Sequence, residues 1–125
     1  MGEPILVVDD NPTNLKLVAY LMTAHGFEVA TAANADEAMA AITAKRPKVI
    51  LMDIQLPGVD GLELTRQLKA DPATRDIVIV AVTAYAMKGD QDRAMDAGCD
   101  GYVTKPIDTR TLPTLIADFI KGARP

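Results

Sequence analysis

The sequence predicts a single α/β domain in which a parallel sheet is covered by helices on both faces. Three short runs rich in Val and Ile are almost entirely apolar, at residues 5–8, 49–52 and 77–82. Continuous apolar character, rather than alternation, is typical of strands buried on both faces of a sheet. Helix signals separate these runs, and strands that alternate with helices indicate right-handed βα units in a doubly wound sheet.

Five strands are expected along the chain. The three apolar runs supply the central ones. Two weaker segments, 27–31 and 101–104, alternate more between polar and apolar residues, so we expect them at the edges of the sheet. Each interval between consecutive strands has room for one crossover helix and its loops. The expected architecture is therefore a five-stranded (βα)5 sheet.

Residues typical of helix starts and helix ends lie in the intervals between the predicted strands. Asn11 followed by Pro12 predicts an N-cap with proline in the first turn, and Gly26 marks the end of that helix. Asn34 is expected to cap a second helix, which stops before Pro47. A fourth helix is expected over residues 89–97, before Gly98. Apolar spacing predicts the remaining two helices, around Leu64 and Leu68 and along the stripe Leu112, Leu115, Ile116, Phe119 and Ile120.

Several single residues receive structural interpretations. His25 lies where a cation is favourable at a helix C-terminus. Cys99 is expected to be a small buried residue. Pro57-Gly58 with Asp60-Gly61 is expected to form the turn after Asp53, where glycine permits tight geometry. Four methionines fall on apolar faces and are expected in the core: Met22, Met39, Met52 and Met95.

The composition fits one small acidic domain spanning residues 1–125. The 125 residues include 13 Lys plus Arg and 17 Asp plus Glu, for a net charge of −4, which argues against a nucleic-acid partner. The single cysteine excludes an internal disulfide and suits a reducing cytoplasm. No apolar run approaches the roughly 18 residues of a membrane span, and no secretory signal is present. We therefore expect a cytoplasmic protein with no membrane partner and no separate output domain.

Polar residues gather where the predicted strands end, and they are Asp9, Asp10, Asp53, Thr83 and Lys105. Ligand sites in open parallel sheets lie outside the carboxyl ends of the strands, so these side chains are expected to converge. Two carboxylates about 4 Å apart repel by roughly 4 kcal/mol at an effective dielectric constant of 20. A proton, Lys105 or a metal ion would compensate the three acids. Mg²⁺ is the economical choice, because a hard divalent cation takes several oxygen ligands.

The chain resembles the receiver domain of two-component response regulators over essentially its whole length. The matching segments are ILVVDDN at 5–11, VILMDIQLPGVDGLEL at 49–64, VAVTAYAMKGD at 80–90 and AGCDGYVTKPI at 97–107. The segment 83–90 looks most like single-domain regulators of the DivK or CheY-like type. The resemblance implies a flavodoxin-like or CheY-like sheet with strand order 2-1-3-4-5.

The same resemblance implies a phosphoryl acceptor and a metal site. Asp53 would accept a phosphoryl group from a phosphohistidine on a partner protein. Asp10 and Asp53 would ligate Mg²⁺ through their carboxylates, Asp9 directly or through a water, and Gln55 through its backbone carbonyl. Mn²⁺ is an expected substitute for Mg²⁺. A carboxylate near such cations stays ionised and nucleophilic near neutral pH.

The resemblance also implies a switch. Thr83, Lys105 and the backbone N–H of Ala84 would contact phosphoryl oxygens. Thr83 would move toward the phosphoryl group, and Tyr102 would then turn inward. The output face would be formed by the fourth helix, the fifth strand and the fifth helix. The implied partners are a sensor histidine kinase or histidine phosphotransfer protein and a downstream protein target, bound by a monomer or weak dimer.

Three other functions share some features with this sequence. A receiver module of a hybrid histidine kinase shares the same motifs. An aspartyl phosphohydrolase of the haloacid dehalogenase type needs a second acid two residues after the nucleophile, where this chain has Gln55. A flavodoxin-like cofactor binder needs phosphate donors after the first strand, where Asp9 and Asp10 would repel a phosphate. We therefore expect no enzyme activity beyond self-catalysed phosphoryl transfer and autodephosphorylation.

Overall fold

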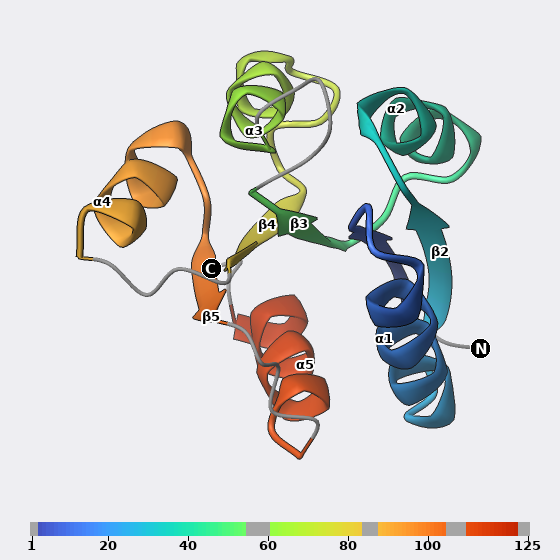
Figure 1. The fold of residues 1–125 in the computed structure, drawn as a ribbon. Helices are drawn as coiled ribbons and strands as arrows, with labels where there is room; N and C mark the ends of the chain where they lie inside the picture. The colour runs from blue at the N-terminus through green and yellow to red at the C-terminus, as the bar shows by residue number, and fades with distance from the viewer. Residues whose placement is uncertain (1–2, 55–60, 84–87, 105–109, 123–125) are drawn as a thin grey trace.

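The computed structural model describes residues 3–54, 61–83, 88–104 and 110–122, with side chains at all of these except residues 83, 88–91 and 122. Strands and helices alternate strictly along the described chain, as the sequence predicts (Figure 1). In order they are β1 (Pro4–Val8), α1 (Pro12–Ala24), β2 (Glu28–Ala32), α2 (Ala35–Ala44), β3 (Val49–Asp53), α3 (Gly61–Ala70), β4 (Val78–Thr83), α4 (Lys88–Ala97), β5 (Gly101–Thr104) and α5 (Leu112–Gly122).

All neighbouring strands pair in parallel, and the sheet order is β2-β1-β3-β4-β5. This confirms the predicted fold class and strand order. Because the chain moves from β1 outward to β2 and then back past β1 to β3, the winding direction reverses between β1 and β3. Ligand sites of doubly wound sheets form outside the carboxyl ends of the strands at such a reversal. The topology therefore directs attention to the ends of β1 and β3.

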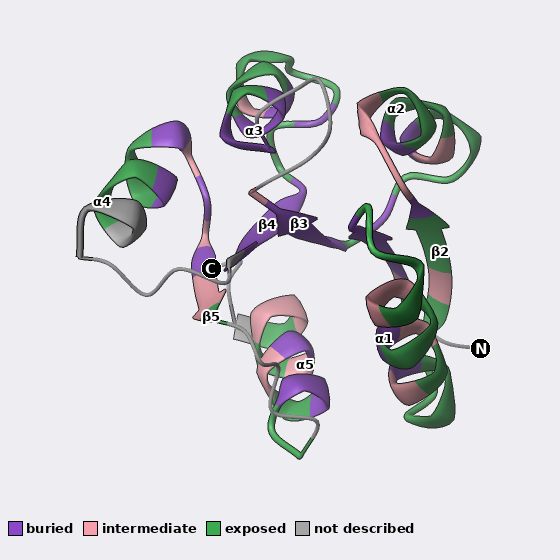
Figure 2. Cartoon of the chain, in the orientation of Figure 1, coloured by how far each residue is buried: buried purple, intermediate pink, exposed green. Residues whose placement is uncertain are grey.

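The central and edge strands differ in burial as predicted. Every residue of β3 is buried, whereas only the last residue of β2 is (Figure 2). Strand β2 pairs only with β1 and lies at one edge of the sheet. A central parallel strand has helices on both faces, which explains its continuous apolar sequence.

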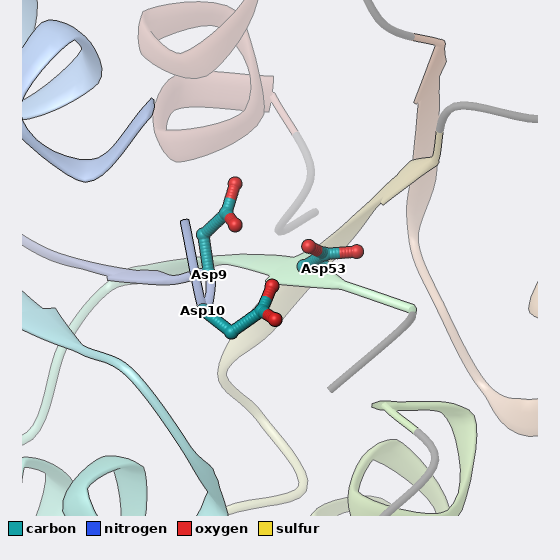
Figure 3. Close-up of side chains that lie close together, drawn as sticks. All are labelled: Asp9, Asp10 and Asp53. Carbon is teal, nitrogen blue, oxygen red and sulfur yellow. The ribbon is translucent and has the colours of Figure 1, made fainter. Parts of the chain in front are cut away.

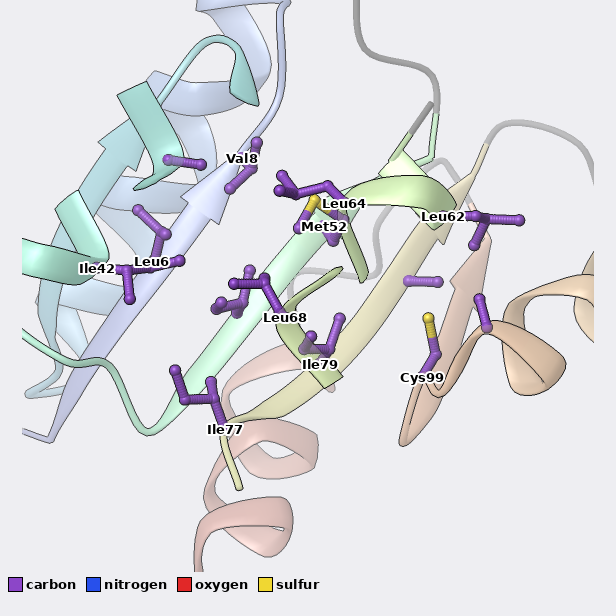
Figure 4. Packing of buried hydrophobic residues seen from close by; sticks show 14 of the residues in the cluster. Leu6, Val8, Ile42, Met52, Leu62, Leu64, Leu68, Ile77, Ile79 and Cys99 are labelled. Atoms are coloured by element: carbon purple, nitrogen blue, oxygen red, sulfur yellow. The ribbon is translucent and has the colours of Figure 1, made fainter. Parts of the chain in front are cut away.

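Two apolar cores hold the layers together, one on each face of the sheet. Helices α2, α3 and α4 cover one face, and α1 and α5 cover the other (Figure 1). Alternate residues of the same strand enter opposite cores: Leu6 packs toward α2 and α3, whereas Val7 packs toward α1. Figure 4 shows the first core, in which Leu64 and Leu68 of α3 lie over the sheet. Cys99 belongs to this core and is 5% exposed, as predicted.

The predicted capping residues are found at both ends of α1. Asn11 is the N-cap, and its side-chain oxygen accepts the backbone N–H groups of Thr13 and Asn14 at 2.9 and 3.2 Å. His25 is the C-cap, followed by Gly26 with a φ of 92°. These caps satisfy backbone groups that a helix leaves without partners, and they fix where the chain enters and leaves the helix.

The prediction of four core methionines is wrong for two of them. Met39 on α2 is 40% exposed, and Met95 on α4 is 47% exposed. Each follows a completely buried alanine, Ala38 or Ala94, that occupies the inward-facing position. The next residue of a helix is rotated by about 100°, so both methionines lie at the edge of their buried faces.

None of the helices within the described ranges has the length and apolar character that a membrane span requires.

Candidate functional site

Three acidic side chains converge at the carboxyl ends of β1 and β3. Asp9 and Asp10 directly follow β1, and Asp53 is the last residue of β3. Val8 is paired with Met52 in the sheet, so the residues that follow them are neighbours. Figure 3 shows Asp10 reaching toward Asp53 from the end of β1. Carboxylate oxygens of the three residues lie within 4.8 Å of one another, which is the convergence expected from the sequence.

The members of this acid cluster (Asp9, Asp10 and Asp53) differ in exposure. Asp9 and Asp53 are only 5% and 4% exposed, whereas Asp10 faces solvent. The Asp9 carboxylate accepts the backbone N–H of Asn11 at 2.9 Å, and the Asp9 N–H donates to the carbonyl of Ala32 at 3.0 Å. Asp9 is therefore held between the end of β2 and the first turn of α1. The cluster combines two buried carboxylates with one that solvent reaches.

The backbone around Asp53 is closely packed by the start of α3. The N–H of Gly61 donates to the carbonyl of Ile54 at 2.8 Å. A Cβ atom at Gly61 would lie 2.2 Å from the Asp53 carbonyl oxygen and 2.9 Å from the Ile54 Cα, both backbone atoms. Inside α3 the buried Thr65 hydroxyl donates to the Gly61 carbonyl at 2.9 Å. Gly61 thus permits the tight geometry predicted beside Asp53.

The structure describes only some of the other residues expected at the site. Thr83 ends β4, where its backbone is paired with Thr104 of β5, but its side chain lies outside the described residues, as do Gln55, Ala84 and Lys105. Tyr102 of β5 is half-buried and packs against the core beneath α2, α3 and α4. Strand β5, which carries Tyr102, lies at the edge of the sheet, as predicted. The functional roles expected for Thr83, Gln55, Ala84, Lys105 and Tyr102 stay predictions.

The acid cluster suits a hard divalent cation. Oxygen ligands of Mg²⁺ lie about 2.1 Å from the ion, so two ligands on opposite sides are about 4.2 Å apart. Carboxylate oxygens within 4.8 Å of one another can reach that spacing with sub-ångström adjustments. One cation would also relieve the mutual repulsion of the three charges. The donor set of three carboxylates, without sulfur or imidazole, favours Mg²⁺ or a similar ion over zinc.

Comparisons with known proteins agree with this geometry. The family model described as "Response regulator receiver domain" matches residues 5–117. The polar-differentiation response regulator DivK of Brucella anthropi is 42% identical over 123 residues, which is 98% of this chain and 100% of that protein.

Two solved structures illustrate the structural likeness. A CheY-like receiver domain protein from Methanospirillum hungatei has a TM-score of 0.88 at 30% identity, with 97% of this chain and 95% of that chain covered. The receiver domain of the sensor histidine kinase PA1611 from Pseudomonas aeruginosa has a TM-score of 0.88 at 32% identity, with 98% and 100% covered. That structure has a magnesium ion coordinated in its active-site cleft.

The family match spans most of the chain, and the curated relative is matched over its full length. These findings confirm the resemblance carried by the sequence motifs. Receiver domains are regulatory modules that bind Mg²⁺ at an acidic pocket and interact with histidine kinases and downstream targets. The chain belongs to the response regulator receiver family of two-component signalling, with a DivK-like and CheY-like domain.

Proposed function

We propose that this protein, acting through residues 1–125 as one receiver domain, accepts a phosphoryl group on Asp53. The donor would be a phosphohistidine on a sensor histidine kinase or a histidine phosphotransfer protein. The observation that carries the proposal is the acid cluster at the sheet reversal, with Asp53 buried at the end of the fully buried strand β3. Three like charges so close together oppose folding, so a ligand that requires them accounts for their presence.

Four oxygen donors of the chain would hold Mg²⁺, and water molecules would complete its octahedral coordination. The carboxylates of Asp9, Asp10 and Asp53 and the backbone carbonyl of Gln55 would hold the ion, with Mn²⁺ as a substitute. When bound, the ion neutralises local negative charge and draws electron density from phosphoryl oxygens. The spacing of the three carboxylates supports this assignment, as does the magnesium ion in the PA1611 receiver domain.

The chemistry requires positioning more than covalent participation by several groups. An Asp53 carboxylate oxygen attacks the phosphorus atom, the new O–P bond forms, and the P–N bond breaks, so that the electron pair leaves with the donor imidazole. Thr83, Lys105 and the backbone N–H of Ala84 would contact the phosphoryl oxygens. The buried placement of Asp53, with α3 packed on its backbone, supports a fixed direction of attack. The product is a regulatory acyl phosphate rather than a released metabolite.

The consequence of phosphorylation would be a changed surface at α4, β5 and α5. A phosphoryl group adds roughly 1.5 to 2 negative charges at the ends of β1 and β3. Thr83 would move toward this charge and Tyr102 would turn further inward. The half-buried state of Tyr102 against the apolar core supports this role, because the ring has room to gain burial. The changed face would then bind a downstream protein.

A receiver module of a hybrid histidine kinase is the second candidate. The structural likeness to the receiver domain of the sensor kinase PA1611 favours it. The chemistry at Asp53 is the same in both cases. The two candidates differ in the donor, which for the hybrid module is a phosphohistidine of the same polypeptide.

Intact-mass analysis after treatment with a small phosphodonor and Mg²⁺ tests the proposal. Wild type is expected to gain one phosphoryl group, and Asp53→Asn none. Asp36→Asn, which removes an exposed carboxylate in the first turn of α2, is the matched control and is expected to be labelled like wild type. An adduct that persists in Asp53→Asn, or no adduct on wild type with several donors and kinases, would contradict the proposed function.

A further inference from the structure

A partly buried ion pair joins α3 to the residue that precedes β5. The Nζ atom of Lys69 lies 2.9 Å from Oδ2 of Asp100, and the two side chains are 18% and 30% exposed. Lys69 also donates to the carbonyl of Ile77 at 2.9 Å and to that of Arg75 at 3.2 Å. An ammonium group has three N–H donors, so these bonds use all of them. Lys69 is therefore held in one place by three acceptors.

Asp100 forms hydrogen bonds with both the N–H and the carbonyl of Ile79, a residue of β4. Its carboxylate oxygen Oδ2 accepts the N–H of Ile79 at 2.9 Å, and its own N–H donates to the Ile79 carbonyl at 2.7 Å. The regular ladder between β4 and β5 begins at the next pair, Val80 with Gly101. Asp100 therefore adds a side-chain bond and a backbone bond immediately before the first pair of that ladder.

The turn between α4 and β5 is shaped to admit the Lys69 side chain. Gly98 has a φ of 108°, a conformation that L side chains rarely adopt. A Cβ atom at Gly98 would lie 2.8 Å from Cγ of Lys69. Glycine at this position thus satisfies the backbone conformation and leaves space for the aliphatic stem of the lysine.

Strand β5 is the shortest strand of the described sheet. It has four residues, Gly101–Thr104, and pairs only with β4 at the edge of the sheet. A slip of one residue in register would send each side chain of β5 to the opposite face of the sheet. Lys105 is the next residue in the sequence after this strand, so a change in the register of β5 would also change the position from which Lys105 starts.

We propose that Asp100, held in place by Lys69, is a positioning residue for phosphoryl uptake: it fixes the register of β5 on β4 and thereby places Lys105. This inference rests on the proposed function, in which Lys105 contacts a phosphoryl oxygen. The acid cluster is carried by β1 and β3 and does not depend on β5. Loss of Asp100 therefore slows phosphoryl uptake and leaves Mg²⁺ binding unchanged.

The test compares two measurements on Asp100→Ala: the rate of phosphorylation by a small phosphodonor, and the dissociation constant for Mg²⁺ from calorimetric titration. The rate is expected to fall about tenfold to a hundredfold, the size of effect that misplacement of a reacting group produces. The Mg²⁺ constant is expected to stay within about twofold of wild type, because no ligand is altered. Asp100→Asn keeps an acceptor for the Ile79 N–H and is expected to restore part of the rate. Asp96→Ala, an exposed acid on α4, is the matched control.

A double-mutant cycle with Lys105→Ala identifies the route of the effect. If Asp100 acts through Lys105, Asp100→Ala causes no further loss of rate in the Lys105→Ala background. Independent, multiplicative losses would overturn the inference, as would an unchanged rate or an equal loss of Mg²⁺ affinity in Asp100→Ala. An unchanged rate in Lys105→Ala would instead contradict the role of Lys105 in the proposed function. Lys69→Met serves as the second variant if Asp100→Ala does not fold. A wild-type protein that takes up no phosphate on Asp53 would instead contradict the proposed function itself.

Discussion

Two polar clusters of this molecule are built on opposite electrostatic principles. The acid cluster gathers three carboxylates at the ends of β1 and β3. The Lys69–Asp100 pair joins one cation and one anion at the start of β5 and distributes their hydrogen bonds over carbonyl and N–H groups of the backbone. The first arrangement costs folding free energy, whereas the second is internally balanced. The contrast separates a site suited to a cation from one that stabilises the fold.

Both clusters depend on a glycine that leaves room for a neighbour. Gly61 lets α3 start against the backbone of Asp53, and Gly98 lets Lys69 reach Asp100. Helix α3 therefore links the two regions, since its first residue packs on the acid cluster and its penultimate residue, Lys69, holds the start of β5. Single substitutions can perturb the acid cluster or the Lys69–Asp100 pair one at a time.

Gly61→Ala is expected to have the largest effect on stability. The new Cβ atom would meet the Asp53 carbonyl oxygen at 2.2 Å, and that backbone atom cannot move without displacing the strand end. We expect a loss of about 2 to 3 kcal/mol in the free energy of unfolding, measured by urea denaturation. Gly101→Ala is the matched control, because its Cβ atom would meet only the end of the Phe119 ring, at 2.5 Å. An equal loss in the two variants would show that the contact with Asp53 is not special.

Lys69→Met is expected to cost about 1 to 2 kcal/mol of stability, because it leaves Asp100 without its cation and removes three hydrogen bonds. Lys45→Met supplies the comparison. Lys45 pairs with Glu28 on the surface, where the two side chains are 59% and 52% exposed. Exposed pairs contribute about 0 to 1 kcal/mol, so this variant should unfold close to wild type. Equal losses in the two lysine variants would remove the distinction between the paired cluster and the surface.

Asp10→Asn is expected to weaken Mg²⁺ binding about tenfold or more, which corresponds to about 1.4 kcal/mol. Without metal the variant should be slightly more stable than wild type, because one like charge is gone from the acid cluster. Thermal unfolding with and without Mg²⁺ measures both effects, with Asp36→Asn as the control. A Mg²⁺-induced rise in Tm that matches wild type in Asp10→Asn would argue against a metal role for the cluster.

The smallest expected effect is a pH dependence at Cys99, beside the Lys69–Asp100 pair. Burial, aided by the Asp100 charge, raises the pKa of the Cys99 thiol to about 11, against smaller opposing effects of a Thr65 hydrogen bond and Lys69. The unfolded chain loses the thiol proton first as the pH rises above about 8.5, so this contribution to stability is complete below that pH and disappears through pH 11. The stability difference between wild type and Cys99→Ala should change by on the order of 1 kcal/mol between about pH 8 and about pH 10. A difference that is constant over this range would contradict the raised pKa.

Local patterns in the sequence were sufficient to predict most of the fold. Apolar runs identified the central strands, and the caps at Asn11 and Asn34 placed two helix starts. The convergence of Asp9, Asp10 and Asp53 followed from one topological rule, because all three residues lie at the carboxyl ends of parallel strands. Methionine burial could not be predicted equally well, since Met39 and Met95 lie at the borders of helix faces and small changes in rotation decide their exposure.

The Lys69–Asp100 pair was beyond sequence reasoning for a different reason. The two residues are separated by 31 positions, and neither carries a local signal such as a cap or a metal-ligand spacing. Lys69 in the last turn of α3 is an ordinary helix C-terminal cation. Only the three-dimensional arrangement of α3, β4 and the turn before β5 brings its ammonium group to Asp100.

The most direct measurement is peptide mapping of the phosphoryl adduct with and without Mg²⁺. The adduct is expected on the peptide that contains Asp53, and it is expected to be lost when the metal is removed by a chelator. A Glu63→Gln variant, altered at an exposed acid in the first turn of α3, is expected to give the same map as wild type. An adduct on another residue, or labelling of Asp53 that is equally fast without divalent metal, would contradict the claim that the acid cluster is a metal-assisted phosphoryl acceptor.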